Sequence, residues 1–237
     1  MYSDLFCNVY NVFGWNYYPE VFGQQLLQWL ERKGIAPKNA LDLACGTGIL
    51  CRILADGGIR TRGMDLSPGM IDIARSTSRG ISYDVADMTD YRPGESFDLV
   101  TCTGDALNHI PEIGALQKIF ENVYAYTNPG GWFVFDLLNE HEVSASDPFE
   151  MDFDEKTRVW FQMTKPGENQ VNLKIRVYEQ ETLAFEEDIR ETIYPPETVC
   201  HILRQCGFTE ITCADRLLED GNPGTTWFIT AKKEEKP

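Results

Sequence analysis

Leu41-Asp42-Leu43-Ala44-Cys45-Gly46-Thr47-Gly48 is the stretch that decides the fold of this 237-residue chain. Its first half lies in a short apolar segment, Ala40–Ala44, which predicts a buried strand. Gly46 and Gly48 allow a tight turn, and the apolar spacing after them predicts a helix that ends at Gly57-Gly58. A strand that runs through a glycine turn into a helix places bare backbone and a helix N-terminus beside a ligand.

The same alternation of strands and helices continues along the chain. Four more strands are predicted, at Ile59–Met64, Ile81–Val85, Phe97–Cys102 and Trp132–Leu138. Helical patterns occur ahead of the first strand and between the others, at 19–33, 68–79 and 112–127. Asn128-Pro129-Gly130-Gly131 predicts the turn before the last of these strands. Strands separated mostly by helices favour right-handed βαβ units, so we expect an α/β fold with a parallel, doubly wound sheet.

The hydrophobic period changes between residues 147 and 194. Apolar and polar residues alternate there, which predicts three or four antiparallel strands inserted into the α/β domain. The α/β pattern then resumes with a helix at Pro196–Cys206 and strands at Ile211–Leu217 and Thr226–Ala231. A short turn at Gly221–Gly224 joins these two strands, so the last strand must run antiparallel to its neighbour.

Composition and charge exclude several classes of protein. The chain is 43% hydrophobic and 24% charged, as globular domains are, and no apolar stretch approaches the roughly 20 residues that span a bilayer. The first residues show no secretory signal, and seven cysteines without a CxxC pair fit a reducing compartment, so we expect a cytoplasmic protein. The three histidines fall in no ligand spacing, so no metal site is expected. A net charge of −16 without a dense basic patch disfavours nucleic acid as a partner.

The glycine turn indicates a nucleotide-type cofactor. A dinucleotide fingerprint needs a third small residue three places after Gly48, and that place holds Cys51. Asp42 also puts a carboxylate at the strand end, where a pyrophosphate prefers no anion. A cofactor that carries a sulfonium and an ammonium tolerates this carboxylate better. The turn therefore points toward S-adenosylmethionine, with an NAD(P)-dependent oxidoreductase as the alternative.

The motifs together resemble the class I S-adenosylmethionine-dependent methyltransferases. Asp42–Gly48 is similar to the first motif of that superfamily, and Met64-Asp65-Leu66-Ser67, Asp87-Met88 and Thr103 follow in the matching order. The resemblance implies a Rossmann-like sheet of seven strands, the last antiparallel, formed by 1–146 and 195–237, with 147–194 as an inserted β lid over the substrate. It also implies that Asp65 holds the ribose hydroxyls, Asp87 the adenine amine and Thr103 the methionine part. The cofactor-binding residues on this basis are Asp42, Ala44, Gly46, Gly48, Asp65, Leu66, Asp87, Met88 and Thr103.

A narrower resemblance concerns the small-molecule enzymes of the glycine N-methyltransferase type. Thr103–Ile110 and Asp136–Asn139 are similar to segments of those enzymes, and so is the aromatic N-terminal segment. This implies that the segment closes over the cofactor and that a tyrosine there, Tyr10 or Tyr18, reaches its carboxylate. The alternative is that the aromatic residues simply pack on the sheet. The Asn/Asp-Pro-Pro-aromatic motif of nucleic-acid methyltransferases is missing after Cys102.

The chemistry sets few requirements on the protein. Methyl transfer from a sulfonium is an in-line displacement that needs no metal, and the enzyme mainly positions the nucleophile and excludes water. A base is needed only for a protonated nucleophile. His109 is our candidate base, and the alternative is that it packs on the Ile110-Pro111 turn. Asp105 and Asn108 are candidates for binding substrate. We expect a monomer or homodimer that methylates a nitrogen or oxygen of a small molecule, or else a non-catalytic S-adenosylmethionine-binding protein.

Overall fold

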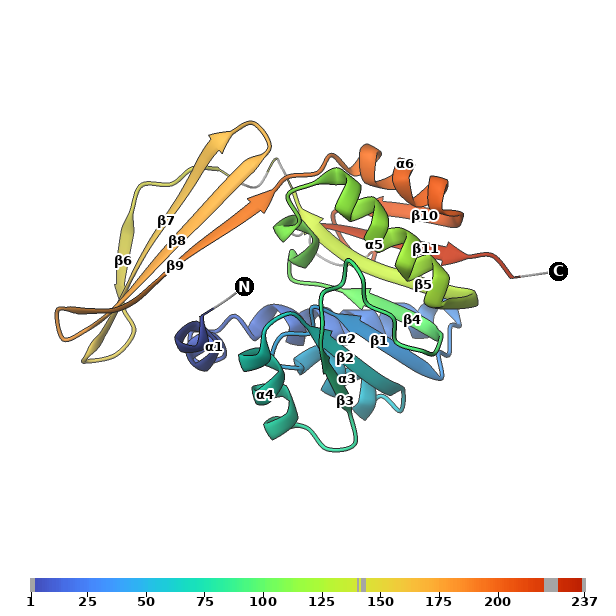
Figure 1. Ribbon diagram of the computed structural model, residues 1–237, viewed down its shortest axis with the longest axis horizontal. Helices are drawn as coiled ribbons and strands as arrows, with labels where there is room; N and C mark the ends of the chain where they lie inside the picture. Colours follow the sequence, from blue (N-terminus) through green and yellow to red (C-terminus); the bar gives the residue numbers. More distant parts are fainter. Residues whose placement is uncertain (1–2, 140, 142–143, 220–225, 236–237) are drawn as a thin grey trace.

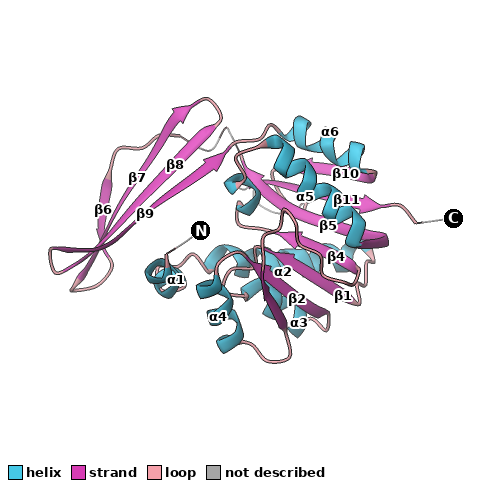
Figure 2. Ribbon diagram, in the orientation of Figure 1, coloured by secondary structure: helices cyan, strands magenta, loops and turns pink. Residues whose placement is uncertain are grey.

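Two β-sheets and six α-helices build the described part of the computed structural model, residues 3–139, 141, 144–219 and 226–235 (Figures 1 and 2). The larger sheet has seven strands in the order β10-β11-β5-β4-β1-β2-β3. The smaller sheet has four strands, β6-β7-β8-β9, and projects from one end of the larger one. The predicted turn at Gly221–Gly224 lies outside the described residues. None of the described helices is long and apolar enough to cross a membrane.

The seven-stranded sheet has the predicted direction of its strands. Parallel pairing joins the five central and edge strands β1 (Asn39–Leu43), β2 (Arg60–Asp65), β3 (Ser82–Val85), β4 (Phe97–Cys102) and β5 (Thr127–Leu138). β11 (Thr226–Lys233) runs antiparallel to β5 and to β10 (Phe208–Ala214). The strand order reverses between β1 and β4, and in open α/β sheets ligands bind at such a point, outside the carboxyl ends of the strands.

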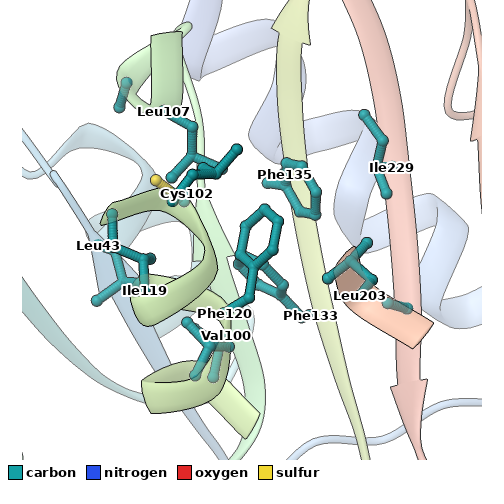
Figure 3. Close-up of a cluster of buried hydrophobic side chains, with 14 of the residues drawn as sticks. Leu43, Val100, Cys102, Leu107, Ile119, Phe120, Phe133, Phe135, Leu203 and Ile229 are labelled. Atoms are coloured by element: carbon teal, nitrogen blue, oxygen red, sulfur yellow. The ribbon is translucent and has the colours of Figure 1, made fainter. Parts of the chain in front are cut away.

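Helices cover both faces of this sheet. α2 (Tyr17–Lys33) and α3 (Ile49–Asp56) pack on one face, and α5 (Ile113–Tyr126) and α6 (Pro196–Cys206) pack on the other. Figure 3 shows the apolar core between the sheet and helices α5 and α6, in which Phe120 of α5 contacts Phe133 and Phe135 of β5. Val134, between those two phenylalanines, faces the other core, under α2 and α3. A strand buried on both faces must be apolar at consecutive positions, which explains the continuous run in the sequence.

The predicted strand at Ile211–Leu217 differs from β10, which begins three residues earlier. Gly207 adopts a left-handed conformation with φ 102° and ends α6, so the chain turns at once and the buried Phe208 begins the strand. The strand ends at Ala214, and Leu217 and Leu218 turn into the core beside α2.

The predicted turn Asn128–Gly131 instead forms the start of β5. The register of β5 against β4 shifts between Phe97 and Leu99, so these residues make an irregular extension of the strand. Gly130 has φ 78°, and a side chain at Gly131 would come within 3.0 Å of the Asp98 carbonyl oxygen. Gly130 and Gly131 thus allow a β-bulge at the start of β5, where the sequence predicts a turn.

The inserted segment forms four antiparallel strands, as the alternation predicts. They are β6 (Phe149–Asp152), β7 (Thr157–Gly167), β8 (Gln170–Glu179) and β9 (Thr182–Thr192). A short helix that the sequence pattern does not reveal, α1 (Asp4–Tyr10), packs between this sheet and α4 (Pro68–Thr77), as Figure 1 shows. Phe6 of α1 is buried against Val159, Ile175 and Val177 of the inserted sheet.

Candidate functional site

The glycine turn after β1 is held in a left-handed conformation at three positions. Ala44 and Gly46 have φ 52°, and Gly48 has φ 76°. A side chain at Gly46 would meet no atom within 4 Å, because this residue faces an open cavity. A side chain at Gly48 would instead come within 2.6 Å of the Tyr83 hydroxyl and 3.0 Å of the Ala74 methyl group. Gly48 is therefore required for packing as well as for backbone conformation.

Asp65, at the carboxyl end of β2, is joined to this turn. Its Oδ2 accepts a hydrogen bond of 2.9 Å from the Gly46 N–H, and its Oδ1 accepts one of 2.8 Å from the Ser67 N–H. Burial raises the pKa of Asp65, while these two backbone hydrogen bonds act in the opposite direction. Each carboxylate oxygen keeps a second lone pair for a ligand, and Asp65 lines the cavity next to it.

Two adjoining cavities lie over the carboxyl ends of β1, β2 and β4. The larger has a volume of about 640 Å³ and extends from Asp65 to the Asp87 loop and the start of α5. The smaller, about 280 Å³, extends from the glycine turn to Tyr18 and the inserted sheet. Both are bordered by the same six residues, namely Tyr10, Ala44, Gly46, Thr103, Gly104 and Ile189.

The predicted adenine-binding residues line the larger cavity. Leu66, Asp87 and Met88 all border it. Oδ1 of Asp87 accepts hydrogen bonds of 2.8 and 2.7 Å from the amide and the hydroxyl of Thr89. This local turn fixes the orientation of the exposed Asp87 carboxylate.

Asp42 is buried under the smaller cavity. Its Oδ1 accepts a 2.7 Å hydrogen bond from the Thr101 hydroxyl, and its Oδ2 accepts a 3.5 Å bond from the Cys51 thiol. Burial raises the pKa of Asp42 to about 7, against the effect of these two donors. Cys51, at the place where the dinucleotide fingerprint needs a glycine or alanine, thus serves as a donor to Asp42.

Tyr18 is bound to a second buried carboxylate, Asp136 on β5. The Tyr18 hydroxyl donates to Oδ2 of Asp136, which also accepts a 2.9 Å bond from the Gly104 N–H. Oδ1 of Asp136 accepts a 2.8 Å bond from the Asp105 N–H. The one proton of Tyr18 is therefore used inside the protein, and its oxygen presents only lone pairs to the cavity.

Tyr10 lines both cavities. Burial, with Asp105 as the next contribution, raises the pKa of Tyr10, so its phenol stays protonated at neutral pH. A protonated phenol is a hydrogen-bond donor, which makes Tyr10 better suited than Tyr18 to bind a carboxylate.

The aromatic N-terminal residues pack against the inserted sheet and also line the smaller cavity. Phe6, Phe13 and Trp15 pack in one apolar cluster with residues of the inserted sheet. Phe6 and Trp15 also form part of the wall of the smaller cavity. The Thr47 hydroxyl in the glycine turn donates a 2.9 Å bond to Oδ1 of Asn11, which ties the segment to the site.

His109 lies between two carboxylates at the edge of the cavities. Its Nε2 is 3.9 Å from Oδ1 of Asp105 and 3.9 Å from Oε1 of Glu191. Burial lowers the pKa of His109, partly opposed by a hydrogen bond to the backbone of Arg190, so the ring is neutral at neutral pH. His109, Ile110 and Pro111 all border the larger cavity, and the alternative role on the Ile110-Pro111 turn stays a prediction.

Asn108 has a structural role. Its Nδ2 donates a 2.8 Å bond to the Thr192 carbonyl, and its Oδ1 accepts a 3.1 Å bond from the Leu138 N–H. The suggested binding of substrate by Asn108 is therefore wrong, because its side chain is fully buried and joins β5 to the end of β9.

Sequence reasoning also missed Asp136 and Glu191 as site residues. Glu191 is one of several acidic residues in an alternating strand, and nothing local distinguishes it.

Known methyltransferases share both the fold of this chain and the segment that contains the glycine turn. Residues 40–131 match the methyltransferase domain family. The ubiquinone biosynthesis O-methyltransferase of Thiobacillus denitrificans is 33% identical over 126 residues, which are 50% of this chain and 52% of that protein. The chain therefore matches only about half the length of that relative.

Solved structures share the whole architecture. An S-adenosylmethionine-dependent methyltransferase of Clostridium acetobutylicum aligns with a TM-score of 0.78 at 24% identity, over 90% of this chain and 91% of the other. An amino pentose methyltransferase of Micromonospora echinaspora, solved with S-adenosylmethionine bound, aligns with a TM-score of 0.77 at 19% identity over 98% of each chain.

The fold and the glycine turn define an S-adenosylmethionine-binding α/β protein. Residues 40–131 match the methyltransferase domain family, the chain shares the fold of solved S-adenosylmethionine-dependent methyltransferases, and S-adenosylmethionine is the cofactor that these findings support. The residues present fit that cofactor, because the open position at Gly46, the carboxylates of Asp65 and Asp87 and the acidic surroundings suit a cationic nucleoside.

Proposed function

We propose that the chain is an enzyme that transfers a methyl group from S-adenosylmethionine to a nitrogen or oxygen of a small molecule. The observation that carries this proposal is the pair of adjoining cavities at the strand ends. One is bordered by Asp65 and Asp87, the other by Glu191 and the inserted sheet, and both contact Gly46. Such an arrangement offers space for a nucleoside and for an acceptor beside it.

The cofactor residues are assigned by their position in this crevice. Asp65 accepts the ribose hydroxyls, Leu66 and Met88 contact the adenine, and Asp87 accepts from its amine. The backbone of Ala44, Gly46 and Gly48, together with Thr103, surrounds the methionine part, and Tyr10 donates to the cofactor carboxylate. Asp42 and the Tyr18–Asp136 pair supply negative charge and lone pairs that favour a cationic cofactor.

The protein's contribution to the reaction is positional. Bound S-adenosylmethionine supplies a methyl group that is already activated by a sulfonium leaving group. The chain holds the acceptor in line with that methyl group and keeps water away. Residues 147–194 act as a lid for this purpose on the α/β domain formed by 1–146 and 195–237. α1 closes the gap between the lid and α4.

A non-catalytic cofactor-binding protein is the competing proposal, and turnover distinguishes the two. The purified chain should convert methyl-labelled S-adenosylmethionine to S-adenosylhomocysteine with at least one member of a panel of amines, phenols and carboxylates. Asp65→Ala should lose this turnover together with cofactor binding. Binding of the cofactor without transfer to any panel member would support the non-catalytic alternative. Binding of NAD or NADP alone would support an oxidoreductase.

A further inference from the structure

Glu191 is a buried carboxylate that faces the site without a hydrogen-bond partner among the described residues. Only 9% of its side chain is exposed, and it lies in the wall of the smaller cavity together with Asp105. Nε2 of His109 lies 3.9 Å from its Oε1, beyond hydrogen-bond distance. A carboxylate that is nine-tenths buried costs free energy unless a ligand binds it, so this position points to a ligand with hydrogen-bond donors.

Glu191 belongs to a group of three side chains that face one another from two elements. Oxygen atoms of Asp105 and Glu191 and a nitrogen of His109 all lie within 4.8 Å of one another. Asp105 and His109 come from the loop and short 3₁₀ helix after β4, and Glu191 comes from the inserted strand β9. The three side chains therefore come together only because the inserted sheet brings Glu191 next to Asp105 and His109.

The spacing of the cluster lies between the values expected for a zinc site and for an ammonium site. An ammonium nitrogen that donates three hydrogen bonds of about 2.8 Å at tetrahedral angles holds its acceptors roughly 4.6 Å apart. Ligands of Zn²⁺ at about 2.1 Å would lie roughly 3.4 Å apart, and those of Mg²⁺ roughly 3.0 Å apart. The measured separations of 3.9 Å are about 0.5 Å wider than the zinc value and about 0.7 Å narrower than the ammonium value, so the metal-salt arm of the test below distinguishes the two cations.

The charge around the cluster also favours a cation. Arg190, the one arginine or lysine that lines the two cavities in the described part of the chain, has a 77% exposed side chain and lies 3.5 Å from Asp188. Carboxylates face the cluster or the cavities from several elements, namely Asp42, Asp65, Asp87, Glu112, Asp136, Glu187 and Asp188. Tyr10, Tyr18 and Cys102 are further titratable side chains near Asp105, whose charge raises the pKa of each. Such a field attracts cationic ligands and repels carboxylates and phosphates.

We propose that the methyl acceptor is an amine that enters as its ammonium form and binds to Asp105, His109 and Glu191. This inference rests on the proposed function and names its substrate class. It assigns the inserted sheet a chemical role, because Glu191 is the part of the acceptor site that the lid supplies.

The cluster also accounts for the proton that the amine must lose. The bound R–NH₃⁺ gives one proton to the cluster, and the neutral amine nitrogen then forms a bond to the methyl carbon. The carbon–sulfur bond breaks, its electron pair goes to sulfur, and the product leaves as a methylated ammonium, R–NH₂⁺–CH₃. Burial raises the pKa of Glu191 to about 7, and burial together with the neighbours Glu191 and Asp136 raises the pKa of Asp105. Glu191 is thus suited to accept a proton near neutral pH.

The test measures acceptor binding on the protein saturated with S-adenosylhomocysteine. Cyclohexylammonium chloride and cyclohexanol serve as probes of matched shape, and thermal shift and calorimetry serve as readouts. The ammonium probe should stabilise the complex clearly more than the alcohol does. Glu191→Gln and Asp105→Asn should each weaken the ammonium probe at least tenfold. Glu186→Gln is the matched control, because Glu186 lies on the opposite face of β9, where it pairs with Arg176 at 2.5 Å.

Each outcome supports the proposal or overturns it. Equal or better binding of cyclohexanol would overturn it, and so would wild-type ammonium binding by Glu191→Gln. Stabilisation by MgCl₂, MnCl₂ or ZnCl₂ without amine, lost in Glu191→Gln, would assign the cluster to a metal instead. In all three cases S-adenosylhomocysteine still binds, so the proposed methyl transfer survives. A protein that binds neither S-adenosylmethionine nor S-adenosylhomocysteine would instead refute the proposed function itself.

Discussion

The backbone N–H of Gly46 donates a 2.9 Å hydrogen bond to Oδ2 of Asp65, although the two residues lie on different strand ends. This bond makes one rigid unit of the glycine turn after β1 and the carboxylate after β2. The turn keeps an open face toward the cavity at Gly46, and the carboxylate borders the same cavity. The bond therefore fixes the position of the carboxylate relative to the turn at the edge of the cavity that a nucleoside would occupy.

Asp65→Ala should weaken the binding of S-adenosylmethionine strongly. Loss of hydrogen bonds between a carboxylate and two hydroxyls costs about 1.5–3 kcal/mol, which corresponds to roughly a 10- to 150-fold rise in Kd. Calorimetry with S-adenosylhomocysteine measures this directly. Asp56→Ala, an exposed carboxylate at the end of α3, is the control and should bind like the wild type. Unchanged affinity in Asp65→Ala would remove Asp65 from the site.

Gly48→Ala should destabilise the fold more than Gly80→Ala. The two glycines have φ 76° and 74°, so both substitutions carry the same backbone cost of about 1 kcal/mol. Only Gly48 has neighbours where the new methyl group would lie, 2.6 Å from the Tyr83 hydroxyl, whereas Gly80 has none within 4 Å. Overpacking adds about 1–3 kcal/mol. Chemical denaturation of both variants measures the difference, and equal losses would contradict the packing argument.

Tyr18→Phe should lower the free energy of unfolding by about 1–2 kcal/mol, because the buried Asp136 loses a donor. The neighbouring Tyr17 is 70% exposed, and Tyr17→Phe should stay within about 0.5 kcal/mol of the wild type. Since Asp136 also holds the amides of Gly104 and Asp105, Tyr18→Phe should raise KM for the acceptor more than it lowers kcat. If the two phenylalanine variants are equally stable, the Tyr18–Asp136 bond has no energetic importance.

Asp42 should make the protein less stable as pH rises toward neutrality. Its folded pKa of about 7 lies above the unfolded value, so the folded state binds more protons between about pH 4 and 7 and the free energy of unfolding falls with pH. Asp42→Asn removes this contribution. The difference in unfolding free energy between wild type and Asp42→Asn, measured at several pH values, should therefore decline from pH 4 to pH 7. A flat difference would show that Asp42 does not titrate in this window.

The sheet was predictable because its signals are local. Each strand of the α/β domain is a short apolar run bounded by a turn or a helix, and glycines mark the turn at 44–48 and the end of α6. The ligand crevice follows from the strand order alone. The strand limits near 208 and 128 were less predictable, because left-handed glycines and a register shift act there and leave only weak traces in the sequence.

The acceptor half of the site depends on contacts between distant residues. Asp136 meets Tyr18 across 118 positions, and Glu191 reaches His109 only through the pairing of the inserted strands. α1 has seven residues and is stabilised by Phe6 against the inserted sheet rather than by its own pattern. No periodicity within a single segment reports such contacts, which explains why they were missed.

Calorimetric titration of the purified wild-type chain with S-adenosylmethionine, S-adenosylhomocysteine, NAD and NADP tests the central claim most directly. We predict saturable binding of the two sulfur nucleosides at one site per chain, with no heat of binding from NAD or NADP. Binding of NAD or NADP without either sulfur nucleoside would contradict the cofactor, the site residues and the proposed methyl transfer together.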